Sequence, residues 1–358
     1  MKDIIGSIIF FVIGLGCIIA NGKLDVANMS IVVALVLFAV GLVLLIKGGD
    51  WFVDGATTIA AKFKIPEIII GATVVSIGTT LPEVMVSAQA AAKGVGAMSY
   101  GNAIGSIICN TSLIAAITLA VKPAKADRKT LAVPVIFFFT AAILYSFTAY
   151  VTRKFTRTTG VVLLCMFAVY MVITVLTALK QKKASNDDHE TDKEENKHTK
   201  SIGVALVLLV LGAVIIAFGA TLLVDNGTII AMAIGVPSSV IALTVVALGT
   251  SLPELVTAIT SLVKGHGSLS LGNIIGANLF NLVLVSGISI TIKGFDVPAE
   301  KTFLSTGLNS SLVVDLPLMF LVMIILTLPA IAKNKLYRWQ GIALLCLYAG
   351  FCVFQFAF

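Results

Sequence analysis

Residues 73–83 read TVVSIGTTLPE and residues 244–254 read TVVALGTSLPE, so the same motif occurs twice in the chain, 171 positions apart. The same shift superposes 71–110 on 242–281 without a gap, and 17 of the 40 positions are identical. Shared apolar composition alone would not keep Gly, Pro, Glu and Asn in register over this length. The chain therefore contains an internal repeat, and each copy places a glutamate among apolar residues.

The composition indicates that both copies lie in a membrane. Of the 358 residues, 58% are hydrophobic and only 12% are charged, whereas soluble domains carry roughly 25% charged residues. Apolar runs recur at about the 20-residue length that a helix needs to cross a bilayer, and they lack the alternation of a membrane barrel. We predict membrane-spanning helices over residues 4–20, 31–60, 65–92, 97–121, 131–152, 157–179, 202–232, 237–263, 268–291, 311–332 and 338–357.

The spacing of the two copies predicts inverted topology. Five predicted spans, an odd number, separate each motif from its copy, so the copies enter the membrane from opposite faces. Such inverted repeats are typical of secondary transporters, whose substrate site lies where the repeats meet. We therefore predict an all-α membrane protein of about eleven transmembrane helices, with a ten-helix core of two inverted five-helix repeats. The predicted parts are an extra N-terminal helix and loop (1–30), the first repeat (31–179), a hydrophilic linker (180–200) and the second repeat (201–358).

The distribution of positive charge predicts the orientation. With the N-terminus in the cytoplasm, 18 of the 25 Lys and Arg residues fall in cytoplasmic loops, as the positive-inside rule requires. The linker 180–200 is then cytoplasmic, and its mixed charge and lack of aromatics predict disorder. The expected location is the plasma membrane, with the lipid bilayer as surroundings. A nucleic-acid partner is not indicated, because no basic run is interleaved with aromatic residues.

The GTTLPE motif predicts a local interruption of its helix. Pro82 lacks an amide hydrogen and clashes with the carbonyl of Gly78, so we expect unwinding that frees carbonyl oxygens where protein or water can satisfy them. The hydroxyl of Thr79 lies four residues before Glu83 and on the same helical face. The second copy offers the equivalent oxygens of Thr250, Ser251 and Glu254.

The two glutamates require a compensating charge. An acidic residue inside a membrane costs about 2.5–3.5 kcal/mol by insertion scales. The nearest repeated cation, Lys93 or Lys264, lies ten residues further on, which is about 15 Å along a helix. Clustered hard oxygens suit Ca²⁺ and Na⁺ rather than softer metals. One Ca²⁺ or two Na⁺ would neutralise two carboxylates, so the ions can compete, and competition with alternating exposure is exchange.

The segments GNAIGSIICN (101–110) and GNIIGANLFN (272–281) combine small and polar residues. Their glycines favour close helix packing. Asn110 and Asn281 end the two segments identically, and we expect both to be ligands, because polar groups are scarce in membrane helices. Asp54 and Asp225 lie near span ends, where we expect headgroups or water to solvate them.

At these residues the sequence closely resembles the calcium/cation antiporter superfamily, and within it the prokaryotic-type sodium/calcium exchangers. The resemblance covers residues 31–357, and GTTLPE and GTSLPE look like the signatures of that family's α-repeats. It implies that Glu83 and Glu254 are the central ligands of Ca²⁺ and Na⁺, without any cofactor. It also implies exchange of three Na⁺ per Ca²⁺, hence net charge movement. The further ligands that it implies are Thr79, Thr80, Thr250, Ser251, the carbonyls of Ser76 and Ala247, the Ser106 hydroxyl and Asn110.

Two positions depart from the family pattern. Ala277 stands where prokaryotic relatives often have a serine, and Asn281 stands where many have an aspartate. The first change removes a hydroxyl from one Na⁺ subsite, which leaves the stoichiometry open. The second removes a charged group that potassium-dependent relatives use, which argues against K⁺ cotransport.

Other functions are compatible with parts of this pattern. Proton-coupled Ca²⁺ exchange is the first alternative, although Asn110 and Asn281 offer no carboxylate to titrate in the third helix of each repeat. The cargo could also be Mn²⁺ or another hard divalent ion. A cation channel would need a continuous pore or selectivity filter, which the inverted repeats do not favour. An enzyme is not indicated, because we find no nucleophile–base pair or cofactor fingerprint.

Overall fold

The computed structural model describes residues 2–23, 30–63, 65–122, 128–187, 201–233, 249, 251–299, 303 and 307–357. Nearly all of them are helical. The helices are α1 (Lys2–Lys23), α2 (Ile31–Phe63), α3 (Glu67–Ile70), α4 (Ser76–Ala92), α5 (Gly96–Cys109), α6 (Ala116–Val121), α7 (Arg128–Thr152), α8 (Arg157–Asp187), α9 (Ile202–Ala233), α12 (Leu252–Val263), α13 (Gly267–Phe280), α14 (Ser286–Ile292), α15 (Leu316–Lys333) and α16 (Arg338–Ala357). The short strands β1 (Lys154–Phe155) and β2 (Phe295–Asp296) pair antiparallel.

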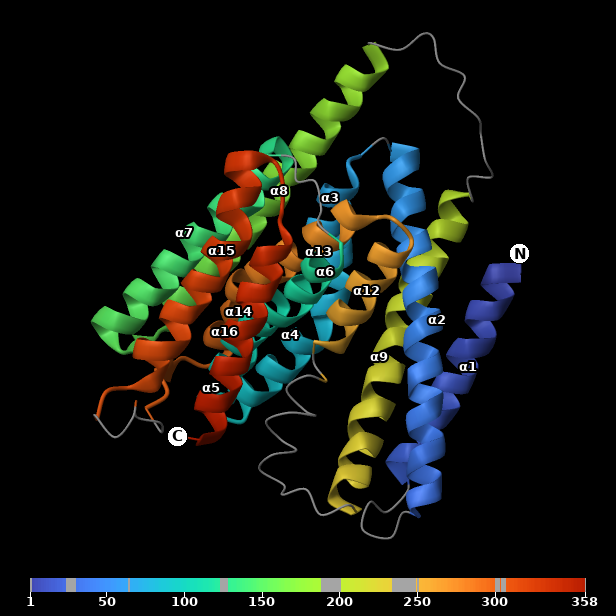
Figure 1. Cartoon of the computed structure of the whole chain (residues 1–358), viewed down its shortest axis with the longest axis horizontal. Helices are drawn as coiled ribbons and strands as arrows, with labels where there is room; N and C mark the ends of the chain where they lie inside the picture. The colour runs from blue at the N-terminus through green and yellow to red at the C-terminus, as the bar shows by residue number, and fades with distance from the viewer. Residues whose placement is uncertain are drawn as a thin grey trace.

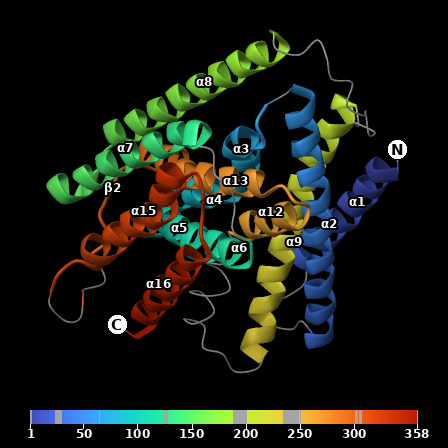
Figure 2. The same cartoon turned by 45° about the horizontal axis from the view of Figure 1, so that its top comes forward.

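The helices form two outer layers around a central group. The long helices α1, α2 and α9 lie on one side, α7, α8 and α15 lie on the other, and the helices of the repeated motif lie between them (Figure 1). The same order is visible after the view is tilted (Figure 2). Burial agrees with this arrangement. In the most apolar 18-residue window of residues 267–292, 83% of the residues are buried, whereas in the corresponding window of α1 only 11% are buried. The repeated motif is thus enclosed by protein, whereas α1 exposes its apolar side chains.

The length and the apolar composition of the helices confirm the membrane fold. Among the described residues, nine helices are long and apolar enough to cross a membrane, and α12 is a shorter apolar helix. Each predicted span coincides with a helix, except that 237–263 is described only at 249 and from 251 onward. The apolar span of α8 is Arg157–Leu179 as predicted, but the helix itself continues to Asp187, eight residues into the predicted linker, of which 188–200 lies outside the described residues.

Contacts between α2 and α9 show the inversion directly. A Cβ on Gly41 would lie 3.0 Å from the carbonyl oxygen of Gly219, and a Cβ on Gly48 would lie 3.0 Å from that of Gly212. The copies of Gly41 and Gly48, 171 positions on, are Gly212 and Gly219. Each glycine therefore meets the copy of the other, which requires that the two helices cross as an antiparallel pair related by a twofold axis.

The predicted unwinding at GTTLPE is wrong for the first copy. Helix α4 runs without interruption through Gly78 and Pro82, and the irregular segment lies earlier, as a π-helical turn over Gly71–Val75. In the second copy α12 begins at Leu252, so that Pro253 lies in the first turn. Proline costs little there, because the first amides of a helix have no partner within it. The two prolines thus have different structural roles despite the repeat.

The structure tests the predicted glycine packing in the second repeat. A Cβ on Gly272 would lie 2.2 Å from the Ile68 carbonyl oxygen, and one on Gly276 would lie 2.3 Å from the Ser76 hydroxyl. The interpretation as packing residues is confirmed for these two. For Gly101 and Gly105 the prediction stays untested: a Cβ there would meet nothing within 4 Å among the described residues, and the positions equivalent to Ile68, Ala72 and Ser76 (239, 243 and 247) lie outside them.

Candidate cation-binding site

The two glutamates of the repeat lie inside the molecule, one from each repeat. Glu83 on α4 and Glu254 on α12 are both fully buried, and the two helices that carry them are in contact. Neither carboxylate has a hydrogen-bond partner or an ion pair among the described residues. Buried carboxylates without partners are unfavourable, so this arrangement calls for positive charge from outside the protein.

Hydroxyl groups of both repeats accompany the two glutamates. Thr79 and Thr80 lie one turn before Glu83 on α4 and are buried. The Thr79 hydroxyl donates to Asn273 Oδ1 at 3.3 Å, and the Thr80 hydroxyl has no hydrogen-bond partner among the described residues. Ser251, directly before α12, is also buried and its hydroxyl has no partner among the described residues. The two motifs thus bring carboxylate and hydroxyl oxygens together from both repeats.

Asn110 and Asn281 occupy equivalent places in the two repeats. Each begins a π-helical turn, Asn110–Ala115 and Asn281–Val285, and π-helical turns are frequent at functional sites. Both side chains are fully buried, and neither amide finds a hydrogen-bond partner among the described residues. Ser106, one helical turn before Asn110 on α5, is buried as well.

Two asparagines that the sequence analysis did not identify as functional form hydrogen bonds with residues of the site. Asn273 on α13 accepts hydrogen bonds at its Oδ1 from the Thr79 hydroxyl and the Ser76 hydroxyl, both at 3.3 Å. Asn102 on α5 donates to the Glu83 carbonyl oxygen at 3.1 Å and to the Ser87 hydroxyl at 2.8 Å. These asparagines are each other's copies in the repeat. Their identity at equivalent positions was the signal that could have indicated them.

The remaining predicted ligands differ in what the structure says about them. Ser76 is buried and its hydroxyl donates to the Gly71 carbonyl oxygen at 2.7 Å and to that of Asn273 at 3.0 Å. Ala247 and Thr250 lie outside the described residues. Ala277 is fully buried on α13 and offers no side-chain oxygen. The structure thus describes nine of the eleven predicted ligands, all of them buried.

Neither repeated lysine, Lys93 or Lys264, pairs with the glutamates among the described residues. Lys264 binds Asp54, with 2.7 Å between Nζ and Oδ1, and also lies 3.4 Å from Asp50 Oδ1. Asp225 accepts a hydrogen bond from Asn21 at 2.8 Å. Both aspartates are at least partly exposed, as their place near span ends predicts, and each also has a protein partner.

An all-helical membrane protein that brings two buried carboxylates together where inverted repeats meet belongs to the cation transporters built from such repeats. The family follows from comparison with known proteins. A family model described as sodium/calcium exchanger protein matches residues 33–176 and 204–357, so this chain belongs to the sodium/calcium exchanger family. Its members are transporters of Na⁺ and Ca²⁺, and are not enzymes.

Similar proteins cover nearly the whole chain. An uncharacterized membrane protein of Methanocaldococcus jannaschii is 34% identical, over 87% of this chain and 94% of that protein. The sodium/calcium exchanger MaX1 of Methanosarcina acetivorans is 28% identical, over 91% of this chain and 99% of that exchanger. A structure of the sodium-calcium exchanger NCX_Mj soaked with Na⁺ and Sr²⁺ has a TM-score of 0.71 at 32% identity, covering 89% of this chain and 97% of that one.

Proposed function

We propose that this protein exchanges Na⁺ for Ca²⁺ by alternating access, with Glu83 and Glu254 as the central ligands of both ions. The observation that carries the proposal is the pair of fully buried carboxylates without protein partners among the described residues. Two formal negative charges are neutralised by one Ca²⁺ or by two Na⁺. Occupancy by one kind of ion therefore excludes the other, which is the basis of antiport at a shared site.

The ligands around the carboxylates follow from the same geometry. Hydroxyls of Thr79, Thr80 and Ser251 supply neutral oxygens of the kind that Ca²⁺ and Na⁺ prefer. In the second repeat, Ala247 and Thr250 complete the set by equivalence with Ser76 and Thr79. Ser106, Asn110 and Asn281 extend the set along the neighbouring helices of each repeat. A third Na⁺ among these groups would make each exchange cycle move one net charge.

The proposal also includes the orientation of the chain in the membrane and its division into two repeats. The chain spans the plasma membrane with its N-terminus and the 180–200 segment in the cytoplasm, as the distribution of Lys and Arg favours. Residues 31–179 and 201–358 act as the two inverted repeats, and α1 is an addition to them.

The proposal is tested with the purified chain in proteoliposomes loaded with Na⁺. Dilution into Na⁺-free medium should drive ⁴⁵Ca²⁺ into the vesicles above its equilibrium level, and Glu254→Gln should abolish this accumulation. A potassium-diffusion potential should change the initial rate if exchange moves net charge. Accumulation driven equally well by a pH gradient without Na⁺ would assign proton-coupled exchange instead. Equilibration without accumulation would indicate a channel.

A further inference from the structure

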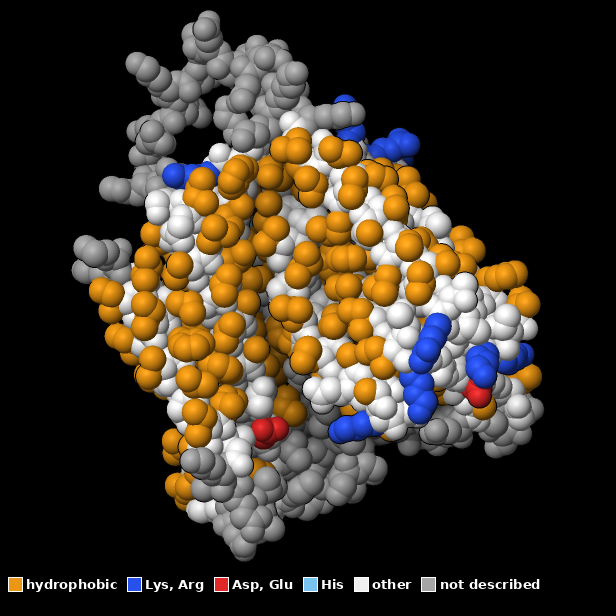
Figure 3. All heavy atoms as spheres, turned by 180° about the vertical axis from the view of Figure 1, so that it is seen from behind, with side chains coloured by type: hydrophobic (Ala, Val, Ile, Leu, Met, Phe, Trp, Pro, Cys, Tyr) orange, Lys and Arg blue, Asp and Glu red, His pale blue; other side chains and the backbone are white. Residues whose placement is uncertain are grey.

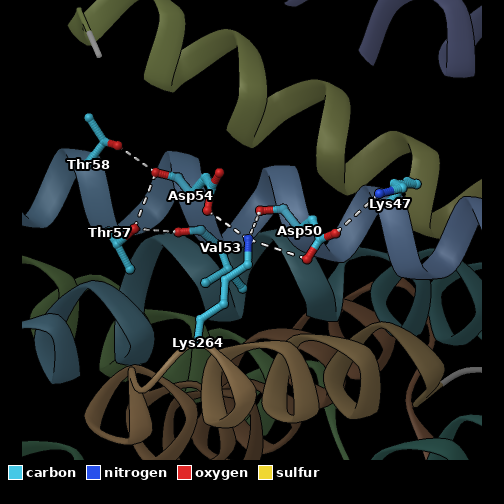
Figure 4. Close-up of polar contacts among 7 residues, drawn as sticks. All are labelled: Lys47, Asp50, Val53, Asp54, Thr57, Thr58 and Lys264. Carbon is cyan, nitrogen blue, oxygen red and sulfur yellow. Dashed lines mark hydrogen bonds and ion pairs between the residues drawn. The ribbon is translucent and has the colours of Figure 1, made fainter. Parts of the chain in front are cut away.

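Lys264 joins the helix that carries Glu254 to the first helix of the other repeat. Its Nζ lies 2.7 Å from Asp54 Oδ1 and 3.4 Å from Asp50 Oδ1, and it donates a hydrogen bond to the Asp50 carbonyl oxygen at 2.8 Å. Figure 4 shows this lysine reaching from the end of α12 to α2, between the two aspartates. The three groups are 26–37% exposed, so they lie at the edge of the protein rather than in its core.

The same contact continues along α12 as close packing. A Cβ on Gly49 of α2 would lie 2.6 Å from the Val256 Cγ1 and 2.9 Å from the Thr260 hydroxyl. Both partners lie between Glu254 and Lys264 on α12. This helix is therefore held against α2 along the whole path from the carboxylate to the lysine.

The repeat predicts an equivalent contact on the opposite face, and the structure does not form it. The copies of Lys264 and Asp54 are Lys93 and Asp225, and the copy of Asp50 is Thr221. Among the described residues Lys93 forms no ion pair, while Asp225 accepts its hydrogen bond from Asn21 of α1. The molecule is thus asymmetric at the two places that its internal symmetry makes equivalent.

A cavity separates α4 from α9 between the site and the residues of the missing contact. It has a volume of about 310 Å³ and lies between α4 and α9, and its lining includes Leu81 and Met85 of α4, Ala213 and Ala217 of α9, and Thr79 of the site. From behind, the surface is hollowed between the two groups of helices, with an acidic side chain near the lower end of one wall and basic side chains on the other (Figure 3). The cavity thus reaches Thr79 from the side where α4 is not held against α9.

We propose that Lys264, Asp50 and Asp54 are positioning residues that hold α12 closed on α2, and that Lys93 and Asp225 form the equivalent contact when the opposite side closes. This inference rests on the alternating access proposed above. Closing α4 onto α9 would remove the cavity, and opening α12 would break the Lys264 contacts. The first contact uses two carboxylates and the second only one, since Thr221 replaces an aspartate. The conformation with α12 closed is therefore the favoured one.

The test measures how accessible the cavity is, without measuring transport. Met85, whose side chain is exposed and lines the cavity, is changed to cysteine in a chain whose five cysteines are replaced. In lipid nanodiscs, the rate at which a charged methanethiosulfonate modifies this cysteine then measures the fraction of molecules in which the cavity is open. Lys264→Gln should slow this rate about fivefold, equivalent to about 1 kcal/mol, the upper end for an exposed ion pair. Adding Lys93→Gln should return the rate close to that of the parent, because both contacts are then absent.

Two control variants separate this effect from general damage. Lys264→Arg keeps the charge and should keep the parental rate. Lys47→Gln removes a weaker contact to Asp50, at 3.9 Å within α2 itself, and should have no effect. A parental rate in Lys264→Gln would overturn the inference, as would a double variant as slow as the single one. Loss of Na⁺-driven flux in the parent would instead contradict the proposed function, which the labelling does not measure.

Discussion

Asn273 holds a hydroxyl of the site from the other repeat. Its Oδ1 accepts from Thr79 at 3.3 Å, so the proton of that hydroxyl points away from the carboxylates and its lone pairs remain available for a cation. A hydrogen bond of this kind contributes about 0.5–1.5 kcal/mol. The effect of Asn273 on ion binding should therefore be measurable although it is not a ligand itself.

Replacing Asn273 with leucine should weaken Na⁺ binding more than it weakens folding. We expect the Na⁺ concentration for half-maximal Ca²⁺ flux to rise by up to about tenfold, which corresponds to about 1.4 kcal/mol. Asn273→Asp keeps an acceptor oxygen at the same place and should have the smaller effect. An unchanged Na⁺ dependence in Asn273→Leu would show that the Thr79 hydroxyl is not a ligand.

Ala277 allows the number of Na⁺ subsites to be tested. It is fully buried on α13 at the position equivalent to Ser106, so Ala277→Ser adds a hydroxyl beside the site with little change in volume. We expect the Na⁺ dependence of Ca²⁺ flux to become steeper in this variant. The reciprocal change Ser106→Ala should make it less steep. Equal Hill coefficients in both variants and the parent would exclude these positions from Na⁺ binding.

At the scale of elements, the crossing of α2 and α9 depends on the absence of side chains. A Cβ on Gly212 would lie 2.7 Å from the Phe52 nitrogen and 2.9 Å from the Gly48 carbonyl oxygen. Because both neighbours are backbone atoms, the helices must separate to make room. Overpacking of this kind costs about 1–3 kcal/mol.

The prediction is that Gly212→Val lowers the thermal unfolding midpoint and Ca²⁺ flux together. Gly203→Val is the matched control on the same helix, since a Cβ there would find its nearest neighbour 4.0 Å away. Thermal unfolding followed by tryptophan fluorescence, with flux measured on the same preparations, checks both. Equal midpoints for the two variants would contradict the close contact of the two helices.

The elements were more predictable from the sequence than the contacts between them. The periodic Gly, Pro and Glu positions revealed the repeat, and the odd number of intervening spans revealed its inversion. Pro82 did not break its helix as expected: α4 is continuous through it, and the irregular π-helical turn lies earlier, over Gly71–Val75. The partners of Lys264 were also missed, since the sequence does not show which helix of the other repeat a lysine reaches. Contacts across an inverted repeat depend on the conformation and not only on the pattern.

For the whole molecule, the two faces that the twofold axis of the repeats exchanges should lie in different compartments. We expect Lys93→Cys, in a chain without other cysteines, to be modified by an impermeant maleimide in intact cells. Lys335→Cys, in the loop between α15 and α16, should be modified only after permeabilisation. Both residues are exposed, so access and not burial decides the result. Labelling of both sites in intact cells would contradict the proposed orientation.

Equilibrium binding of ⁴⁵Ca²⁺ to the purified chain tests whether Glu83 and Glu254 bind the same ion. We expect binding that Na⁺ displaces and that Glu83→Gln and Glu254→Gln each abolish. Glu67→Gln should leave it unchanged, because Glu67 pairs with His266. Retention of Na⁺-sensitive Ca²⁺ binding in either Glu83→Gln or Glu254→Gln would contradict a shared site.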